Sequence, residues 1–419
     1  MIATPRPTWT HRRAEIALLL VPALTLGAIA RFVPIANVSF PLNDGGLFYV
    51  MSQDLVRLGF ALPDVTSYNN AGIPFAYPPL ALYALGILSA AGLDAIQLLR
   101  WIPFVVSVMT IPLVYLVAKE LLGSWRIAGV AALAFALIPR SYEWTITGGG
   151  LTRGLGMAMA LLAIWQGLRL IRTPNPMHVA LTGLFGGLTV LTHPEASLFV
   201  VITLGTFVAA FGRTIRTAMA MVIAGIIGGL VSAPWWLSIL LLHGPGLLVG
   251  AADSRTAQLP NALRNFLFGD FTGASALDIF LGIGFVGLLV QVGRGRYVLP
   301  VWLLGLVIFI VAAGFTFAAV PWAMLTAIAV MEVVLPSAGR LFPAHVHARA
   351  IVTGGLLGAG MLATLATGYS TATPIHGLSP EQRSAMQWIN ESLPPDARFV
   401  VVTGVDWPKD ATSEWFPAL

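Results

Sequence analysis

The sequence contains no cysteine, and only 10% of its 419 residues are charged. The absence of cysteine excludes disulfides, thiolate metal sites and a catalytic thiol. Soluble globular proteins are about one quarter charged, whereas hydrophobic residues make up 57% of this chain. A soluble fold could not bury so much apolar surface, so the composition indicates an integral membrane protein.

Basic clusters are also missing, although the formal net charge is +5. The longest basic run is Arg12-Arg13, and the other cations are scattered singly between apolar runs. This distribution argues against nucleic acid as a partner and is typical of loop charges that set membrane topology. The lipid bilayer is therefore an expected partner.

Apolar runs long enough to cross a hydrocarbon core of about 30 Å recur from residue 16 to residue 370. With the basic N-terminus in the cytoplasm, they predict an all-α, multi-pass cell-membrane protein of about 11 transmembrane helices, within a range of about 10–12. Leu80–Gly92 is too short for a confident span, and counting it as a crossing would put the arginines of the next loops outside. We interpret it as a juxtamembrane helix.

This topology divides the chain into a transmembrane domain, residues 1–370, and an extracytoplasmic C-terminal segment, residues 371–419. The transmembrane domain has a long first extracytoplasmic loop at 37–79 and a second large outer loop at 243–275. Ala28-Ile29-Ala30 matches the small-residue pattern of a signal-peptide cleavage site. Small residues are common in membrane helices, so an uncleaved anchor is the favoured interpretation.

The C-terminal segment has a mixed pattern. Ser379-Pro380-Glu381 predicts the start of a helix, and Phe399-Val400-Val401-Val402 predicts a buried strand. One helix and one strand cannot bury a core. We therefore expect this short extracytoplasmic α/β segment to be truncated or to be completed by another chain.

Asp44 follows the first predicted span, within Asn43-Asp44-Gly45-Gly46. These residues also form simple turns, because Asn, Asp and Gly tolerate positive φ and hydrogen-bond locally. The functional interpretation is a carboxylate held at the membrane face, where it could accept a proton from an attacking hydroxyl. Asp44 is the candidate catalytic base.

Arg140, Glu143 and Arg153 bracket the stretch Thr147-Gly148-Gly149-Gly150 on the same predicted face. One interpretation is a tight reversal between helices with interfacial arginines. The other is a phosphate site, because Arg pairs bidentately with phosphate oxygens and glycine amides approach an anion closely. Both interpretations remain open from these residues alone.

His193-Pro194-Glu195 interrupts an apolar stretch, also on the outer face. An ordinary loop histidine and a helper in anion binding are both compatible with this pattern. The sequence has neither a spaced His pair of the zinc-protease kind nor an Asp-x-Asp pair. We therefore predict no metal site and no other cofactor, and a divalent metal has no support in the sequence.

The layout resembles the GT-C superfamily of membrane glycosyltransferases. The resemblance rests on Asp44 in a long first outer loop, the proline-started helix at Tyr77-Pro78-Pro79-Leu80, and the alternating spans. The superfamily includes protein O-mannosyltransferases, aminoarabinose transferases and oligosaccharyltransferase catalytic subunits. The Thr147–Arg153 loop, the Leu191–Glu195 turn and Ser413-Glu414-Trp415-Phe416-Pro417 are similar to segments of uncharacterised prokaryotic members.

The resemblance implies a polyprenyl-phosphate-linked sugar as donor and a catalytic aspartate at Asp44. The acidic metal-binding pair and the Trp-Trp-Asp motif of oligosaccharyltransferases are missing, which counts against N-glycosylation and leaves a metal-independent sugar transfer. Our hypothesis is an inverting transfer in which Asp44 takes the proton of a hydroxyl of a protein, lipid or glycan acceptor. The remaining candidate site residues are Arg140, Arg153 and His193 for the donor phosphate, with Glu143, Gly149, Glu195 and Tyr77 in support.

Two other functions remain open. A transporter or lipid flippase needs polar access from both faces, whereas the predicted helices carry almost no mid-span charge. A non-catalytic scaffold predicts that Asp44 and the arginines do not converge. A separation of more than about 15 Å between Asp44 and Arg153 would leave no room for one sugar-phosphate site.

Overall fold

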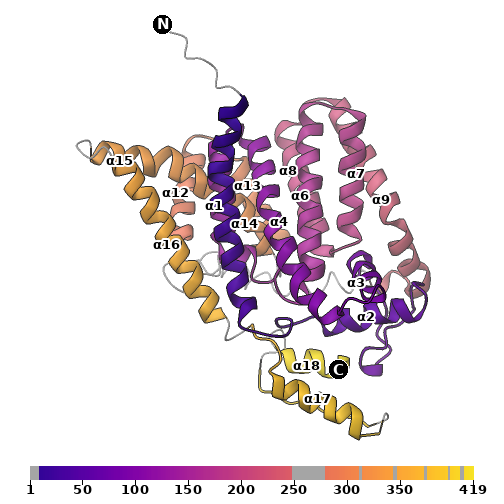
Figure 1. The fold of residues 1–419 in the computed structure, drawn as a ribbon. Coiled ribbons are helices and arrows are strands. Elements are labelled where there is room, and N and C mark those ends of the chain that lie inside the picture. Colours follow the sequence, from indigo (N-terminus) through magenta and orange to yellow (C-terminus); the bar gives the residue numbers. More distant parts are fainter. Residues whose placement is uncertain are drawn as a thin grey trace.

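The computed structural model describes residues 9–247, 279–310, 314–342, 347–371, 375–394, 397–405 and 410–419. Over these residues the chain is helical, and the only pairing of extended segments is an isolated antiparallel bridge between Val65 and Pro74. Figure 1 shows the long helices side by side in one bundle, with α1 starting at one end and the C-terminal helices lying beyond the other.

Within the described residues, seven stretches of helix are long and apolar enough to cross a membrane. This confirms the predicted helical, multi-pass membrane class. The stretches lie in α1 (Trp9–Ala36), α4 (Ala95–Leu122), α6 (Gly150–Arg172), α8 (Pro194–Phe211), α9 (Ile215–His243), α14 to α15 (Gly314–Ala329, the π-helical η3 Val330–Val334 and Leu335–Leu341) and α16 (Ala348–Thr371).

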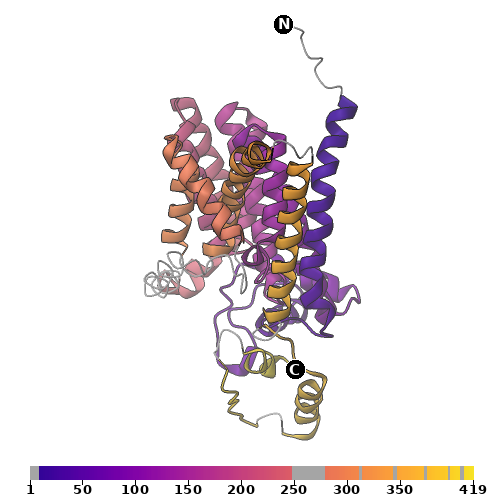
Figure 2. The same cartoon turned by 90° about the vertical axis from the view of Figure 1, so that its left-hand side faces the viewer.

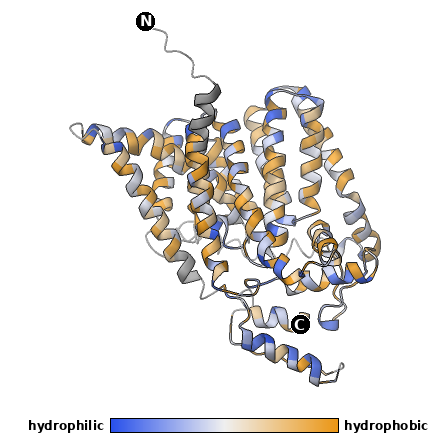
Figure 3. Cartoon of the chain, viewed as in Figure 1, coloured by the Kyte–Doolittle hydropathy of each residue, from blue (hydrophilic) through white to orange (hydrophobic). Residues whose placement is uncertain are grey.

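Shorter apolar helices complete the bundle: α5 (Trp125–Leu137), α7 (Pro176–Val190), α12 (Ile279–Gly293) and α13 (Val298–Phe309). They occupy positions at which the sequence predicts further spans, so the span count of about 11 stays a prediction. Figure 3 shows hydrophobic residues along the bundle helices and more hydrophilic ones in the C-terminal helix α17. Figure 2 shows α16 beside α1, with which it is in contact.

Small side chains allow the central helices to pack closely. Ala128, Ala131 and Ala132 of α5 are fully buried in the main apolar core, which also contains the side chains of α14. Small residues let helix backbones approach within a membrane, where dispersion contacts replace the hydrophobic effect. The closely packed core helices thus hold the ends of the connecting loops in fixed positions.

The first outer loop contains α2 (Gly46–Arg57) and precedes α3 (Leu80–Ala90). Figure 1 places both helices at the bundle end nearest the C-terminal helices. Helix α3 is 11 residues long, and its juxtamembrane placement stays a prediction. Asp54 in α2 is 6% exposed and accepts hydrogen bonds from Thr66 and Ser67, so it ties the loop to α2 and has a structural role.

The C-terminal segment corrects one prediction. The helix predicted at Ser379 is present as α17 (Pro380–Ser392), with Ser379 in a capping box. The predicted strand Phe399–Val402 is wrong: residues 397–405 form no regular secondary structure. Val400 and Val402 are 89% and 86% exposed, because no second strand among the described residues lies alongside to pair with the segment.

The chain then forms the short helix α18 (Ala411–Trp415) and the 3-10 turn η5 (Phe416–Ala418). The second outer loop predicted at 243–275 lies outside the described residues from 248 onward.

Candidate active site

The Asp44 turn is held against the glycine-rich stretch after Thr147. Asn43 has φ +53° and Gly45 has φ +129°, so the turn uses the left-handed conformations that Asn and Gly tolerate. The Leu42 carbonyl accepts a hydrogen bond of 2.9 Å from the Gly148 N–H. Two segments about a hundred residues apart in the chain therefore meet at Asp44.

Gly148 and Gly149 permit this close approach. A Cβ atom at Gly148 would lie 2.0 Å from the Asp44 carbonyl oxygen, and one at Gly149 would lie 2.4 Å from Asp44 Oδ2. The Gly149 N–H donates a 2.9 Å hydrogen bond to Asp44 Oδ1. The absence of side chains at Gly148 and Gly149 thus lets Asp44 approach the backbone, and the Gly149 amide binds the Asp44 carboxylate.

Asp44 also forms an ion pair with Arg153, with 2.9 Å between Oδ2 and Nη2. The side chains are 21% and 29% exposed, so the pair is only partly open to solvent. The Arg153 guanidinium lies 5.6 Å from the centre of the Trp144 ring and donates to Thr147 Oγ1 at 3.3 Å. The separation of more than 15 Å expected for a non-catalytic scaffold is therefore contradicted.

A cavity of about 280 Å³ opens beside this ion pair. Its volume lies close to the lower end, about 300 Å³, of the usual range for ligand pockets. Arg140, also at the cavity, pairs with Glu143 at 3.2 Å. The cavity is lined by Arg140, Trp144, Thr145, Arg153, Met157, His193, Glu195, Phe315, Thr316 and Phe317.

His193 and Glu195 reach the cavity from the turn between α7 and α8. His193 is 5% exposed and is the N-cap residue of α8. A Cβ at Gly156 of α6 would lie 2.7 Å from the His193 Cβ, so a glycine there lets the turn pack against α6. The Leu80 N–H donates to the Leu191 carbonyl at 2.9 Å, which fixes the same turn to the start of α3.

Tyr77 connects the loop before α3 to this group. Its hydroxyl lies 3.0 Å from Thr152 Oγ1, and its ring centre lies 6.4 Å from that of His193 and 4.7 Å from that of Phe48. Burial raises the pKa of Tyr77 to about 12, so the phenol stays neutral at physiological pH. The phenol can therefore orient neighbours by hydrogen bonding.

The structure brings the predicted site residues into one region at the bundle end that carries α2 and α3. Asp44, Arg153 and Gly149 touch directly. Arg140, His193 and Glu195 line the cavity, Glu143 pairs with Arg140, and Tyr77 lies against His193. Within the described parts of the chain, no group of three or more His, Asp or Glu side chains is arranged to hold a metal ion.

Arg31 is a residue of this region that the sequence reasoning missed. It lies in α1, is 0% exposed, and donates to Ser107 at 2.9 Å and to the Ala136 carbonyl at 2.9 Å. Its guanidinium lies 4.7 Å from the Tyr142 ring centre, just before the Trp144 segment of the cavity. Arg31 could have been identified from the sequence as a single cation within an apolar run, because a charge at membrane depth is costly and marks a candidate functional residue.

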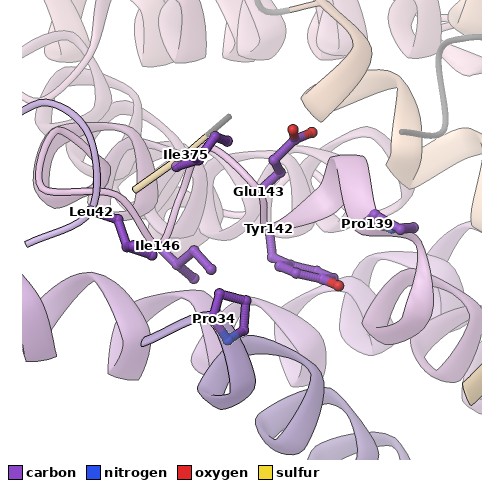
Figure 4. A pocket seen from close by; sticks show the side chains of 7 residues that line it. All are labelled: Pro34, Leu42, Pro139, Tyr142, Glu143, Ile146 and Ile375. Atoms are coloured by element: carbon purple, nitrogen blue, oxygen red, sulfur yellow. The ribbon is translucent and has the colours of Figure 1, made fainter. Parts of the chain in front are cut away.

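A much smaller cavity lies beside Tyr142 (Figure 4). It has a volume of about 20 Å³, enough for roughly one water molecule. Tyr142 and Glu143 line it together with the apolar residues Pro34 and Leu42. It is too small for a sugar, and the candidate substrate site is the cavity of about 280 Å³, because Arg140, Arg153 and His193 line it.

Solved structures similar to this chain define its fold. The crystal structures of the Archaeoglobus fulgidus oligosaccharyltransferase match it with TM-scores of 0.62 (complex with Zn and sulfate; 18% identity, covering 90% of this chain) and 0.64 (apo form; 15% identity, covering 93%). The matched regions cover 55% and 59% of those chains, so the present chain spans little more than half of their length.

ArnT from Cupriavidus metallidurans bound to undecaprenyl phosphate matches with a TM-score of 0.53 and 15% identity, covering 97% of this chain and 84% of that one. The chain therefore shares the fold of these two proteins, in agreement with the resemblance drawn from the layout of the sequence.

Residues 76–237 match the family model of dolichyl-phosphate-mannose-protein mannosyltransferases. This region includes Arg140, Arg153 and His193, and a match to a glycosyltransferase family agrees with the fold. None of the curated proteins compared with the chain matches it.

Proposed function

We propose that the chain is a glycosyltransferase that moves a sugar from a polyprenyl-phosphate donor to an acceptor hydroxyl at the extracytoplasmic membrane face. The observation that carries this proposal is the Asp44–Arg153 ion pair at a cavity lined by Arg140 and His193. Arg140 and Arg153 line the cavity and supply a phosphate site, and Asp44, which pairs with Arg153, supplies a proton acceptor beside it. The match to a mannosyltransferase family model supports the same reaction class.

In the proposed reaction, the acceptor oxygen bonds to the anomeric carbon as the bond from that carbon to the phosphate oxygen breaks. The acceptor proton passes to Asp44, and the phosphate leaves on its lipid. Attack opposite the leaving group inverts the anomeric configuration. The negative charge of the leaving phosphate grows during this step, and Arg140 and Arg153 are placed to stabilise it.

The resting ion pair leaves Arg153 able to bind a second partner as well as Asp44. Before the donor binds, its guanidinium pairs with Asp44 through Nη2. A donor phosphate in the cavity then binds the same guanidinium, because its planar group can donate to oxygens of more than one partner. The arginine thus holds Asp44 close to the sugar while neutralising the phosphate. This mechanism assigns charge stabilisation to arginine rather than to a divalent metal.

The direct test incubates the purified protein with a panel of radiolabelled polyprenyl-phosphate sugars and follows the label into acceptor or water. We expect Asp44→Asn to lower the transfer rate by about 10²- to 10⁴-fold, the usual contribution of a general base. Asp64→Asn is the matched control, because Asp64 is an exposed acid of the same loop. Full transfer by Asp44→Asn would show that Asp44 is not the base.

Two further experiments distinguish the proposed reaction from a metal-dependent transfer and from lipid transport. Addition of EDTA should leave transfer unchanged, and loss of transfer that a divalent ion restores would contradict the metal-independent mechanism. In proteoliposomes, movement of the labelled lipid across the bilayer without any sugar transfer would identify a flippase instead.

A further inference from the structure

Helix α2, which starts directly after Asp44, does not provide its own N-terminal cap. Its N-cap residue is Gly45, which has no side chain to accept the free backbone N–H groups of the first turn. Such groups are normally satisfied by Ser, Thr, Asp or Asn at that position. The start of α2, and with it the Asp44 turn, therefore needs an acceptor from elsewhere.

Glu414 provides that acceptor. Its Oε1 accepts hydrogen bonds from the N–H groups of Leu47 at 3.1 Å and Gly45 at 3.4 Å. These are the N2 and N-cap positions of α2, whose N–H groups have no acceptor within the helix. A residue 369 positions away in sequence from Gly45 thus caps the helix that begins beside Asp44.

Trp415 fixes the other side of the same turn. Its indole N–H donates to the Asn43 carbonyl at 2.9 Å, and its side chain is 0% exposed. The ring centre lies 4.6 Å from that of Phe40, in an edge-to-face contact. Glu414 and Trp415 therefore bind the backbone on both sides of Asp44, at residues 43, 45 and 47.

The short helix α18 that carries these two residues is itself closely fitted. The Asp410 side chain accepts from the N–H groups of Thr412 and Ser413, which caps α18. A Cβ at Gly46 would lie 2.4 Å from the Glu414 carbonyl oxygen, so α18 packs directly on the α2 backbone. Figures 1 and 2 both show α18 between α17 and the bundle end that carries the site.

We propose that Glu414 and Trp415 are positioning residues for Asp44, so that residues 410–419 form part of the active site. The catalytic consequence rests on the proposed glycosyl transfer, whereas the docking of α18 onto the Asp44 turn does not. Glu414 acts here as a hydrogen-bond acceptor, and its negative charge is not required. That distinction makes the proposal testable.

The test compares Glu414→Gln with Glu414→Leu. Glutamine keeps an oxygen that accepts both N–H groups, so its kcat should stay within about threefold of wild type. Leucine removes the acceptor, and we expect kcat to fall by about 10- to 100-fold, because a shift of about 1 Å in a catalytic group costs up to that much. The KM for the donor should change by less than about threefold, because Glu414 is absent from the cavity lining.

A second readout does not depend on activity. Hydrogen exchange in peptides spanning residues 43–50 should accelerate by about tenfold in Glu414→Leu and stay unchanged in Glu414→Gln. The matched control is Glu391→Leu in α17, which replaces an exposed glutamate of the same segment. This control should match wild type in both assays.

Should Glu414→Leu fail to fold, Trp415→Phe removes the indole hydrogen bond together with part of the buried ring, and it should give a smaller loss of kcat with faster exchange. Wild-type exchange and kcat in Glu414→Leu would overturn the positioning role. Inactive Glu414→Gln with wild-type exchange would overturn it as well, because the charge or proton of Glu414 would then be essential. If wild type transfers no sugar, exchange still decides the docking, so the two proposals fail separately.

Discussion

Replacing Gly149 by alanine tests the geometry of the site with a single methyl group. Gly149 has φ −68° and ψ −11°, a conformation that alanine adopts without strain. A Cβ there would lie 2.4 Å from Asp44 Oδ2 and 2.8 Å from Oδ1. Ordinary contacts of this kind begin near 3.4 Å. The carboxylate must therefore move by about 1 Å.

This displacement acts on catalysis more than on folding. It separates Asp44 from the Gly149 N–H and from Arg153, which now hold it at 2.9 Å each. A misplacement of about 1 Å in a reacting group typically costs about 10² in rate, so we expect kcat to fall by about 100-fold. The Tm in detergent should change little, because alanine adopts the backbone conformation of Gly149 and the displaced carboxylate is partly open to solvent. The assay is transfer of labelled sugar from the lipid donor.

Gly154→Ala is the matched control, because Gly154 lies in α6, the helix that begins directly after Gly149. Its Cβ would meet nothing closer than 3.5 Å, from the Val106 side chain, which is an ordinary contact. We expect its kcat to remain within about twofold of wild type, since no catalytic group moves. Wild-type activity in Gly149→Ala would refute the reasoning, and so would an equal loss in Gly154→Ala.

Three further changes probe other parts of the region. Arg31→Met leaves hydrogen-bond partners on α4 and α5 without a donor, so thermal unfolding in detergent should show a loss of about 1–3 kcal/mol, and unchanged stability would contradict this. Arg153→Lys keeps the charge without the planar fork, so the donor KM should rise about tenfold, and an unchanged KM would exclude bidentate binding. Burial raises the pKa of Glu414, which faces Asp44 and Tyr68, so the ionised form is disfavoured in the docked tail. Docking is therefore strongest below the ordinary carboxyl pKa and weakens as pH rises through the raised pKa, and exchange corrected for its intrinsic pH dependence should show this in wild type but not in Glu414→Gln.

Much of the fold and part of the site could be predicted from the sequence, because polar residues are rare in it. Loop charges placed Asp44, Arg140, Arg153 and His193 on one face, and the structure gathers all four at one end of the bundle. The direct pairing of Asp44 with Arg153 could not be predicted. It depends on a backbone approach that only Gly148 and Gly149 allow, which composition does not reveal.

The C-terminal segment shows the opposite case. Phe399–Val402 has the pattern of a buried strand, yet a strand needs a neighbour to pair with, and local sequence does not say whether one exists. The role of Glu414 was equally hidden, because its partners lie 367 and 369 residues away in sequence. The sequence around α2 therefore does not identify Glu414 as the residue that caps this helix.

Arg153 lies between the Asp44 carboxylate and the proposed phosphate site, so the charge of Asp44 affects both donor binding and the transition state. Two like charges about 4 Å apart repel by about 4 kcal/mol at an effective dielectric constant of about 20. Asp44 therefore opposes binding of the donor in the ground state and favours the transition state, where it receives a proton. Asp44→Asn should accordingly lower kcat while binding the donor more tightly, which isothermal titration with a non-hydrolysable donor analogue measures. Weaker donor binding by Asp44→Asn would contradict this reasoning. It would mean that Arg153 depends on Asp44 for its orientation, and that this effect on donor binding exceeds the repulsion between Asp44 and the donor phosphate.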